Sequence, residues 1–179
     1  AGGLLMKYTS PGRALLTAYG VQGIALVHGQ NGLTAANGFA DQGEVLVKTR
    51  MAADLVAATK MDRPEWITAD PFTAGSIYCT LTNNSQRGEA GKPAADAANP
   101  RANNLFGHII HWHEADGDGT KLSFKWYILV LAGNKQAAKP EHKGNINGDD
   151  FGSPDGLAFD NRGVLWIQTD VSTSTLNMK

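Results

Sequence analysis

Cysteine is nearly absent from this sequence, because Cys79 is the single one among 179 residues. One cysteine cannot form a disulfide within the chain, and it cannot supply a CxxC zinc-binding pattern. A secreted scaffold held together by disulfides is therefore excluded. Export itself is not excluded, because many exported bacterial proteins contain no disulfide.

The sequence also lacks an excess of charge and a long apolar run. Lys and Arg total 16, Asp and Glu total 17, and the formal net charge is −1. This balance predicts neither a nucleic-acid partner nor binding to an anionic membrane surface. No apolar run is long enough to span a membrane, and residues 1–27 do not resemble a signal peptide. If the protein is exported, we expect its targeting segment to lie outside this chain.

Glycine is abundant instead, with 21 residues, or about 12% of the chain against about 7% on average. Such a composition favours a turn-rich fold over a helical bundle. Apolar residues make up 42% and charged residues 18%, which is typical of a globular domain with a sizeable core.

One segment, at about 41–59, has a helical pattern. Asp41 is a suitable N-cap, and Glu44 follows three residues later, as in a capping box. Five apolar residues fall close to one helical face: Val45, Met51, Ala52, Leu55 and Val56. The pattern predicts one helix packed on the side of a larger body.

After residue 60 the pattern changes to short strands rich in β-branched and aromatic residues. Strands are predicted at 66–70, 76–83, 107–114 and 122–131, followed by a hairpin of 156–160 and 164–170. The polar stretches at 84–106 and 133–153 contain Gly and Pro, and they predict loops.

Two segments repeat one pattern, in the order Pro, acid, any residue, aliphatic, small, any residue, Asp. They lie at 64–70 and 154–160, and each is followed by a turn and an aromatic-containing strand. Four antiparallel strands followed by a restart are typical of a propeller blade. We therefore predict a mainly β fold, a partial β-propeller of about one and a half four-stranded blades with one preceding α-helix. The full blade lies at about 65–131 and the half blade at about 154–171.

A propeller of this size is incomplete, because propellers close with about four to eight blades. Its outer strands would keep unpaired edges. We therefore expect residues 1–179 to be a fragment of a larger propeller, or a single domain that pairs its edges with further copies. The alternative is a single domain of another β topology.

The repeat places Glu65 and Asp155 at equivalent positions, each at the start of the first strand of a blade. That strand lines the central channel of a propeller, so the two carboxylates are predicted to converge. Carboxylate oxygens suit Ca²⁺, which takes about six to eight oxygen ligands. The alternative is that Asp155 belongs only to a turn and that Glu65 is a surface acid.

Arg63 lies two residues before Glu65, so in an extended chain the two side chains point the same way. A guanidinium beside a metal-bound carboxylate can bind phosphate or carboxylate through two hydrogen bonds. The alternative is that Arg63 only neutralises Asp62 or Glu65.

Other polar residues give weaker indications of a site. Of the histidines at 108, 111 and 113, only His111 and His113 share a strand face, which indicates a packed or exposed face rather than a zinc site. The oxygen-rich loop at 145–150 lacks the Gly and Glu of an EF-hand. Cys79 lies within a predicted strand and is expected to be a core residue.

Several stretches resemble the PhoX family of bacterial alkaline phosphatases. They are residues 32–34, 37–42, 58–66, 78–84, 99–104, 107–109, 145–149, 151–157 and 163–170. The resemblance implies a six-bladed β-propeller exported through the twin-arginine route to the periplasm or outside the cell. It also implies hydrolysis of phosphate monoesters at a cluster of calcium (Ca²⁺) and ferric (Fe³⁺) ions.

The resemblance implies a phosphate-binding role for Arg63 and metal ligation by Glu65 and Asp155. The iron-binding cysteine of the family belongs to a part absent from this chain, so that role is not assigned to Cys79. Members of the family are much longer and have further acidic ligands outside this segment. We therefore expect the chain alone to be inactive.

Two other functions are compatible with the sequence. The chain could be a non-catalytic propeller piece that self-assembles by edge-strand pairing. It could also be a propeller of the lactonase or phosphotriesterase type, which would use a calcium ion in its channel.

Overall fold

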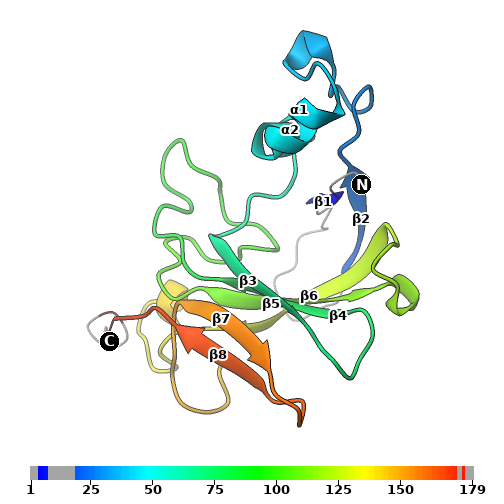
Figure 1. Cartoon of the computed structure of the whole chain (residues 1–179). Coiled ribbons are helices and arrows are strands. Elements are labelled where there is room, and N and C mark those ends of the chain that lie inside the picture. Colours follow the sequence, from blue (N-terminus) through cyan, green and yellow to red (C-terminus); the bar gives the residue numbers. More distant parts are fainter. Residues whose placement is uncertain (1–3, 8–18, 173–174, 176–179) are drawn as a thin grey trace. The chain divides into compact units, whose positions relative to one another are not determined.

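The computed structural model describes residues 4–7, 19–172 and 175 of the chain, with side chains from residue 23 onward (Figure 1). The described chain divides into two compact units. Of the described residues, the first unit contains 4–7 and 20–59, and the second contains Tyr19 and all those from Lys60 onward. Among the described residues, no helix has the length and apolar character needed to cross a membrane.

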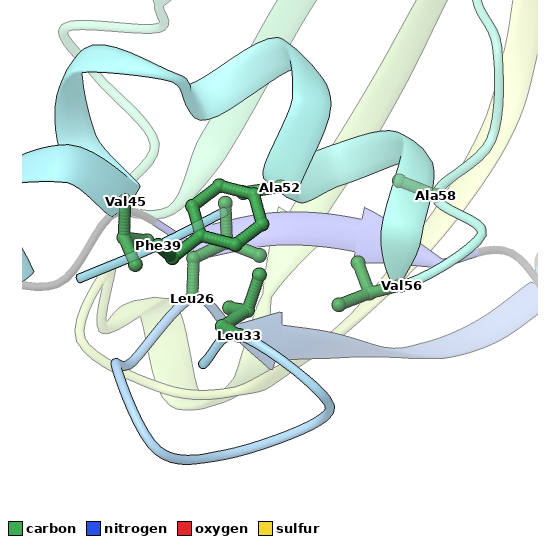
Figure 2. Close-up of a cluster of buried hydrophobic side chains, with 7 residues drawn as sticks. All are labelled: Leu26, Leu33, Phe39, Val45, Ala52, Val56 and Ala58. Atoms are coloured by element: carbon green, nitrogen blue, oxygen red, sulfur yellow. The ribbon is translucent and has the colours of Figure 1, made fainter. Parts of the chain in front are cut away.

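The first unit combines a strand pair with two short helices. Strand β1 (Leu4–Lys7) pairs antiparallel with β2 (Tyr19–Ala25), and a 3-10 turn (Ala35–Asn37) precedes α1 (Gln42–Val47) and α2 (Thr49–Leu55). Figure 2 shows the small apolar core of this unit, which contains Leu26, Leu33, Phe39, Val45, Ala52, Val56 and Ala58. Burial of these side chains stabilises helices that are too short to form alone.

The predicted helix begins as expected. Asp41 is the N-cap, and its side chain accepts a hydrogen bond from the Glu44 N–H at 2.9 Å. Glu44 in turn accepts a hydrogen bond from the backbone N–H of Ala40 at 2.8 Å, one residue earlier than in a standard capping box.

The prediction of one continuous helix over 41–59 is wrong, because two helices meet at Lys48 (φ −95°, ψ 32°) and the second ends at Leu55. The Thr49 hydroxyl donates to the carbonyls of Val45 and Leu46, and such back-bonding bends helices. Ala57 then has φ 53°, which a right-handed helix cannot include. The predicted apolar face is also only partly buried, since Met51 and Leu55 are exposed.

The second unit contains a four-stranded antiparallel arrangement in chain order. Its strands are β3 (Pro64–Ala69), β4 (Ser76–Leu81), β5 (His108–Glu114) and β6 (Ser123–Leu131). They lie within two residues of the predicted positions. The stretch 84–106 is a loop, as predicted, and it is held by a bridge between Asn84 and Asn104.

A second, two-stranded sheet follows. It pairs β7 (Pro154–Phe159) with β8 (Leu165–Thr169), and β7 packs against β3 and β4 (Figure 1). The described chain is therefore mainly β, with antiparallel sheets and few helices, as the sequence predicts. The start of β7 and the start of β3 hold the predicted site residues.

Candidate functional site

The two sequence repeats have the same backbone geometry. Each proline that opens a repeat follows a residue in the left-handed region, Arg63 before β3 and Ser153 before β7, both with φ 49°. In each repeat the pairing register then shifts, between Pro64 and Ile67 and between Pro154 and Leu157. Such irregularities re-aim side chains next to functional sites. Glu65 and Asp155 both lie within these shifted segments.

Arg63 has a strained backbone that is fixed by hydrogen bonds on either side. The left-handed conformation costs a non-glycine residue about 1–2 kcal/mol. The Arg63 N–H donates to the Met61 carbonyl at 3.0 Å, and its carbonyl accepts from the Thr82 N–H at 3.0 Å. The side chain itself is 52% exposed. The side chain of Arg63 is therefore accessible to solvent, whereas its backbone is held by hydrogen bonds.

Arg63 and Glu65 form an ion pair, as their spacing predicts. The Arg63 Nε lies 3.0 Å from Glu65 Oε1, and its Nη2 lies 4.0 Å from Asp170 Oδ2. The alternative pairing of Arg63 with Asp62 is not formed, because Asp62 is buried against Arg87. The guanidinium therefore lies between carboxylates from β3 and from the residue after β8.

Asp155 joins this group from β7. Partial burial raises the pKa of Asp155, and the neighbouring carboxylates of Asp170 and Glu65 raise it further, whereas Arg63 lowers it. The backbone carbonyl of Asp155 accepts a hydrogen bond from the Thr80 hydroxyl at 2.7 Å, which docks β7 on β4. The charge of Glu65 therefore acts on Asp155, although β3 and β7 lie far apart in the sequence.

Asp170 is a member of the group that the sequence interpretation missed. Its N–H donates to the Ser153 carbonyl at 2.9 Å, just as the Thr82 N–H donates to Arg63 in the first repeat. Asp170 is therefore the repeat equivalent of Thr82. A signal was present, because antiparallel pairing of the predicted hairpin places the end of its second strand beside the Pro-Asp that opens the first.

Comparison with known families identifies the family of the chain. The family model described as alkaline phosphatase PhoX matches residues 7–179. The chain belongs to the PhoX family of alkaline phosphatases.

A solved structure of PhoX from Pseudomonas fluorescens, in complex with vanadate, a transition state analogue, is similar to this chain. The two are 47% identical, with a TM-score of 0.81, over 88% of this chain. The chain spans 27% of the length of that PhoX chain. A comparison with curated protein sequences finds no significant match.

The acidic side chains of Glu65, Asp155 and Asp170 are of a chemical type that can bind a hard cation. Burial and the neighbouring carboxylates of Asp170 and Glu65 disfavour the charged form of Asp155, and a cation bound beside it would favour that form. Their oxygen atoms are the ligand type that Ca²⁺ prefers. No group of three or more His, Cys, Asp and Glu within the described ranges has the arrangement of a complete metal centre. The described residues therefore do not form a complete metal centre by themselves.

The histidines of β5 differ in their surroundings. His111 packs against Tyr78 and Tyr127, with ring centroids 4.4 and 4.9 Å away, and hydrogen-bonds the Ser76 hydroxyl at 2.7 Å. His108 is buried and His113 is exposed. This arrangement agrees with the predicted packed strand face.

Cys79 is a core residue, as predicted. It is 5% exposed, and burial raises the pKa of its thiol to about 11. In the absence of a metal ion, a thiol with this pKa stays protonated at neutral pH. In the loop at 145–150, Asn145 and Asp150 accept backbone hydrogen bonds from Leu131 and Lys135, which is a structural role.

Proposed function

We propose that this chain contributes part of the active site of a PhoX-type alkaline phosphatase that hydrolyses phosphate monoesters. In this proposal Arg63 binds the phosphate, and Glu65 and Asp155 are metal ligands. The observation that carries it is the convergence of these three side chains with Asp170 from two strands that repeat one sequence pattern.

The proposed metals are calcium (Ca²⁺) and ferric iron (Fe³⁺). Glu65 and Asp155 would hold calcium, and Asp170 lies beside them as a further oxygen donor. Bound metal ions supply Lewis acidity, which polarises a phosphoryl oxygen and neutralises developing charge. By the resemblance to the family, the cysteine that holds iron belongs to a part of the enzyme other than this chain, and Cys79 is a buried core residue.

Arg63 would orient the substrate. Glu65 holds its Nε, so the plane of the guanidinium is set by a contact within the chain. The two Nη atoms make no hydrogen bond of 3.5 Å or less within the described residues, although Nη2 lies 4.0 Å from Asp170 Oδ2, and a guanidinium can donate two parallel hydrogen bonds to phosphate oxygens. Holding the phosphoryl group in one orientation lowers the entropic cost of reaching the transition state.

The proposed architecture is a partial β-propeller, with one blade at about 65–131 and half a blade at about 154–171. The shared backbone geometry of the two repeats supports it. The remainder of the propeller would supply the other metal ligands, which fits the 27% share of the solved PhoX chain that is covered. We further propose a periplasmic or secreted location, by the resemblance to exported phosphatases.

A second candidate is a non-catalytic piece that assembles by edge-strand pairing. It is favoured by the outer strand β3, where Trp66 is 52% and Ile67 63% exposed. Turnover and the mass in solution separate the two candidates. Calcium-dependent hydrolysis by the full-length enzyme would support the first. Stable oligomers of this chain, together with no hydrolysis by the full-length protein, would support the second.

Substitution of Arg63 tests the proposed function. In the full-length enzyme we expect Arg63→Ala to lower kcat/KM for a generic phosphate monoester by about 10²-fold or more. Arg162→Ala is the matched control, because Arg162 pairs with Asp160 on the surface of the β7–β8 hairpin. Unchanged kinetics in Arg63→Ala would overturn the assignment. The isolated 179-residue chain is expected to show little or no turnover, because its ligand set is partial.

A further inference from the structure

A fully buried carboxylate directly precedes Arg63. Asp62 is 0% exposed, while the Arg63 side chain beside it is 52% exposed. A buried charge is costly unless it is paired and hydrogen-bonded. The presence of this buried charge next to the proposed phosphate-binding residue therefore requires an explanation.

Asp62 has a complete set of partners. Its Oδ1 accepts hydrogen bonds from Arg87 Nε at 2.6 Å and Asn84 Nδ2 at 3.0 Å, and its Oδ2 accepts from Asn104 Nδ2 at 2.9 Å. Its backbone N–H donates to Asn99 Oδ1 at 2.8 Å. Both the side chain and the backbone of Asp62 are therefore fixed.

All four partners come from the long loop at 84–106. Arg87 also donates to the carbonyls of Lys60 and Ala94, at 2.6 and 2.9 Å, and Asn99 Nδ2 donates to Lys60 at 2.9 Å. The loop thus holds residues 60–62 through buried, charge-assisted hydrogen bonds, which are among the stronger ones in proteins. This explains how a long irregular loop has one conformation.

The network ends at the strained backbone of Arg63. A residue with φ 49° keeps that conformation only when its surroundings over-determine it. Asp62 fixes the chain on the N-terminal side of Arg63, and the hydrogen bond from the Thr82 N–H fixes its carbonyl. The second repeat reaches the same φ at Ser153 with Gly152 in the place of Asp62. The buried acid therefore accompanies the arginine and is not a general requirement of the repeat.

We propose that Asp62, paired with Arg87, is a positioning residue that fixes the backbone of Arg63 and so aims its guanidinium at the phosphate. The inference rests on the proposed function of Arg63. A carboxylate is required at this position because three donors converge on it. Asparagine would offer them a single acceptor oxygen and would place an NH₂ group against a donor.

A double-mutant cycle in the full-length enzyme tests this role, with inorganic phosphate as a competitive inhibitor. We expect Asp62→Asn to raise the inhibition constant for phosphate about tenfold, with a smaller change in kcat. In the Arg63→Ala background the same substitution should have no further effect, because it acts through Arg63. Ile110→Val is the control, since Ile110 lies in the core on β5, and it should lower Tm without changing phosphate inhibition.

The cycle separates the possible results. An unchanged inhibition constant in Asp62→Asn, or an equal rise with and without Arg63, would overturn the positioning role. If Arg63→Ala itself leaves phosphate inhibition unchanged, both this role and the proposed function of Arg63 are overturned.

Two further measurements keep the proposal testable if Asp62→Asn does not fold. Asn84→Ala removes one donor to Asp62 from a half-buried residue, and we expect a rise of a few-fold in the inhibition constant, again absent without Arg63. Amide hydrogen exchange at Thr82, whose N–H is bonded to the Arg63 carbonyl, should become faster in either variant. Unchanged exchange at Thr82 would contradict the positioning role even if phosphate hydrolysis is confirmed.

Discussion

The hydroxyl of Thr80 donates a hydrogen bond to the backbone carbonyl of Asp155 at 2.7 Å, across 75 positions of sequence. The hydroxyl oxygen of Thr80 also accepts a hydrogen bond from the Trp66 N–H at 3.0 Å. One buried side chain on β4 therefore connects β3 with β7. It does so beside the two acids that we propose as metal ligands, so the relative position of these acids depends on it.

Replacing Thr80 by valine should destabilise the chain. Thr80→Val leaves the Trp66 N–H and the Asp155 carbonyl without their partner, and we expect a loss of about 1–3 kcal/mol in the free energy of unfolding. Urea denaturation measures this loss as a lower transition midpoint with an unchanged m value, the slope of the unfolding free energy against urea concentration. Thr82→Val is a matched control, because Thr82 is equally buried and its hydroxyl has no hydrogen-bond partner within the described part of the chain. Equal losses in the two variants would contradict this role for Thr80.

Removing the charge of Asp170 should lower the pKa of Asp155. Asp170→Asn takes away a neighbouring negative charge, so Asp155 should ionise at lower pH in calcium-free protein. Carboxyl NMR titration measures this shift directly. Asp160→Asn is the control from the same hairpin, where Arg162 and the Val164 N–H hold the pKa of Asp160 near 2. A titration of Asp155 that does not respond to Asp170→Asn would show that the carboxylates are not close enough to interact.

Bound calcium should also lower the pKa of Asp155. Protons and Ca²⁺ compete for the same oxygens, so calcium should lower the apparent pKa of Asp155 when it binds. Asp170→Asn should weaken calcium binding in the full-length enzyme, and Asp160→Asn should not. Equal calcium affinity in the wild type and Asp170→Asn would remove Asp170 from the ligand set.

Mild acid should destabilise the second unit through His108. Burial is the main cause that lowers the pKa of His108 to about 4, and its ring hydrogen-bonds the Ala98 carbonyl at 2.7 Å. Between about pH 6.5 and 4 the unfolded chain takes up a proton that the folded chain excludes, so stability should fall as pH falls, by up to about 1.4 kcal/mol per pH unit. Denaturation across this range measures it. His108→Gln should flatten the dependence and the exposed His113→Gln should not; a steep dependence retained in His108→Gln would contradict the assignment.

Much of the secondary structure was predictable, because it depends on residues close in sequence. The Asp41 cap needs only the Glu44 N–H three positions later, and the strands follow from runs of β-branched and aromatic residues. The break at Lys48 was not predicted, because the apolar pattern continues through it. The break accompanies a hydrogen bond from the Thr49 hydroxyl to the Leu46 carbonyl, which the pattern does not reveal.

The sequence by itself determined the mainly β fold, the strand order along the chain and the repeat that singled out Glu65 and Asp155. Only the tertiary structure decided that Asp170 joins them, that Arg63 has a left-handed backbone and that Asp62 is buried against Arg87. The physical reason is that these features depend on contacts between distant residues. The attraction within an ion pair becomes strong only after packing has excluded water and lowered the local dielectric constant. A strained backbone dihedral persists only when the residues on either side are held in place.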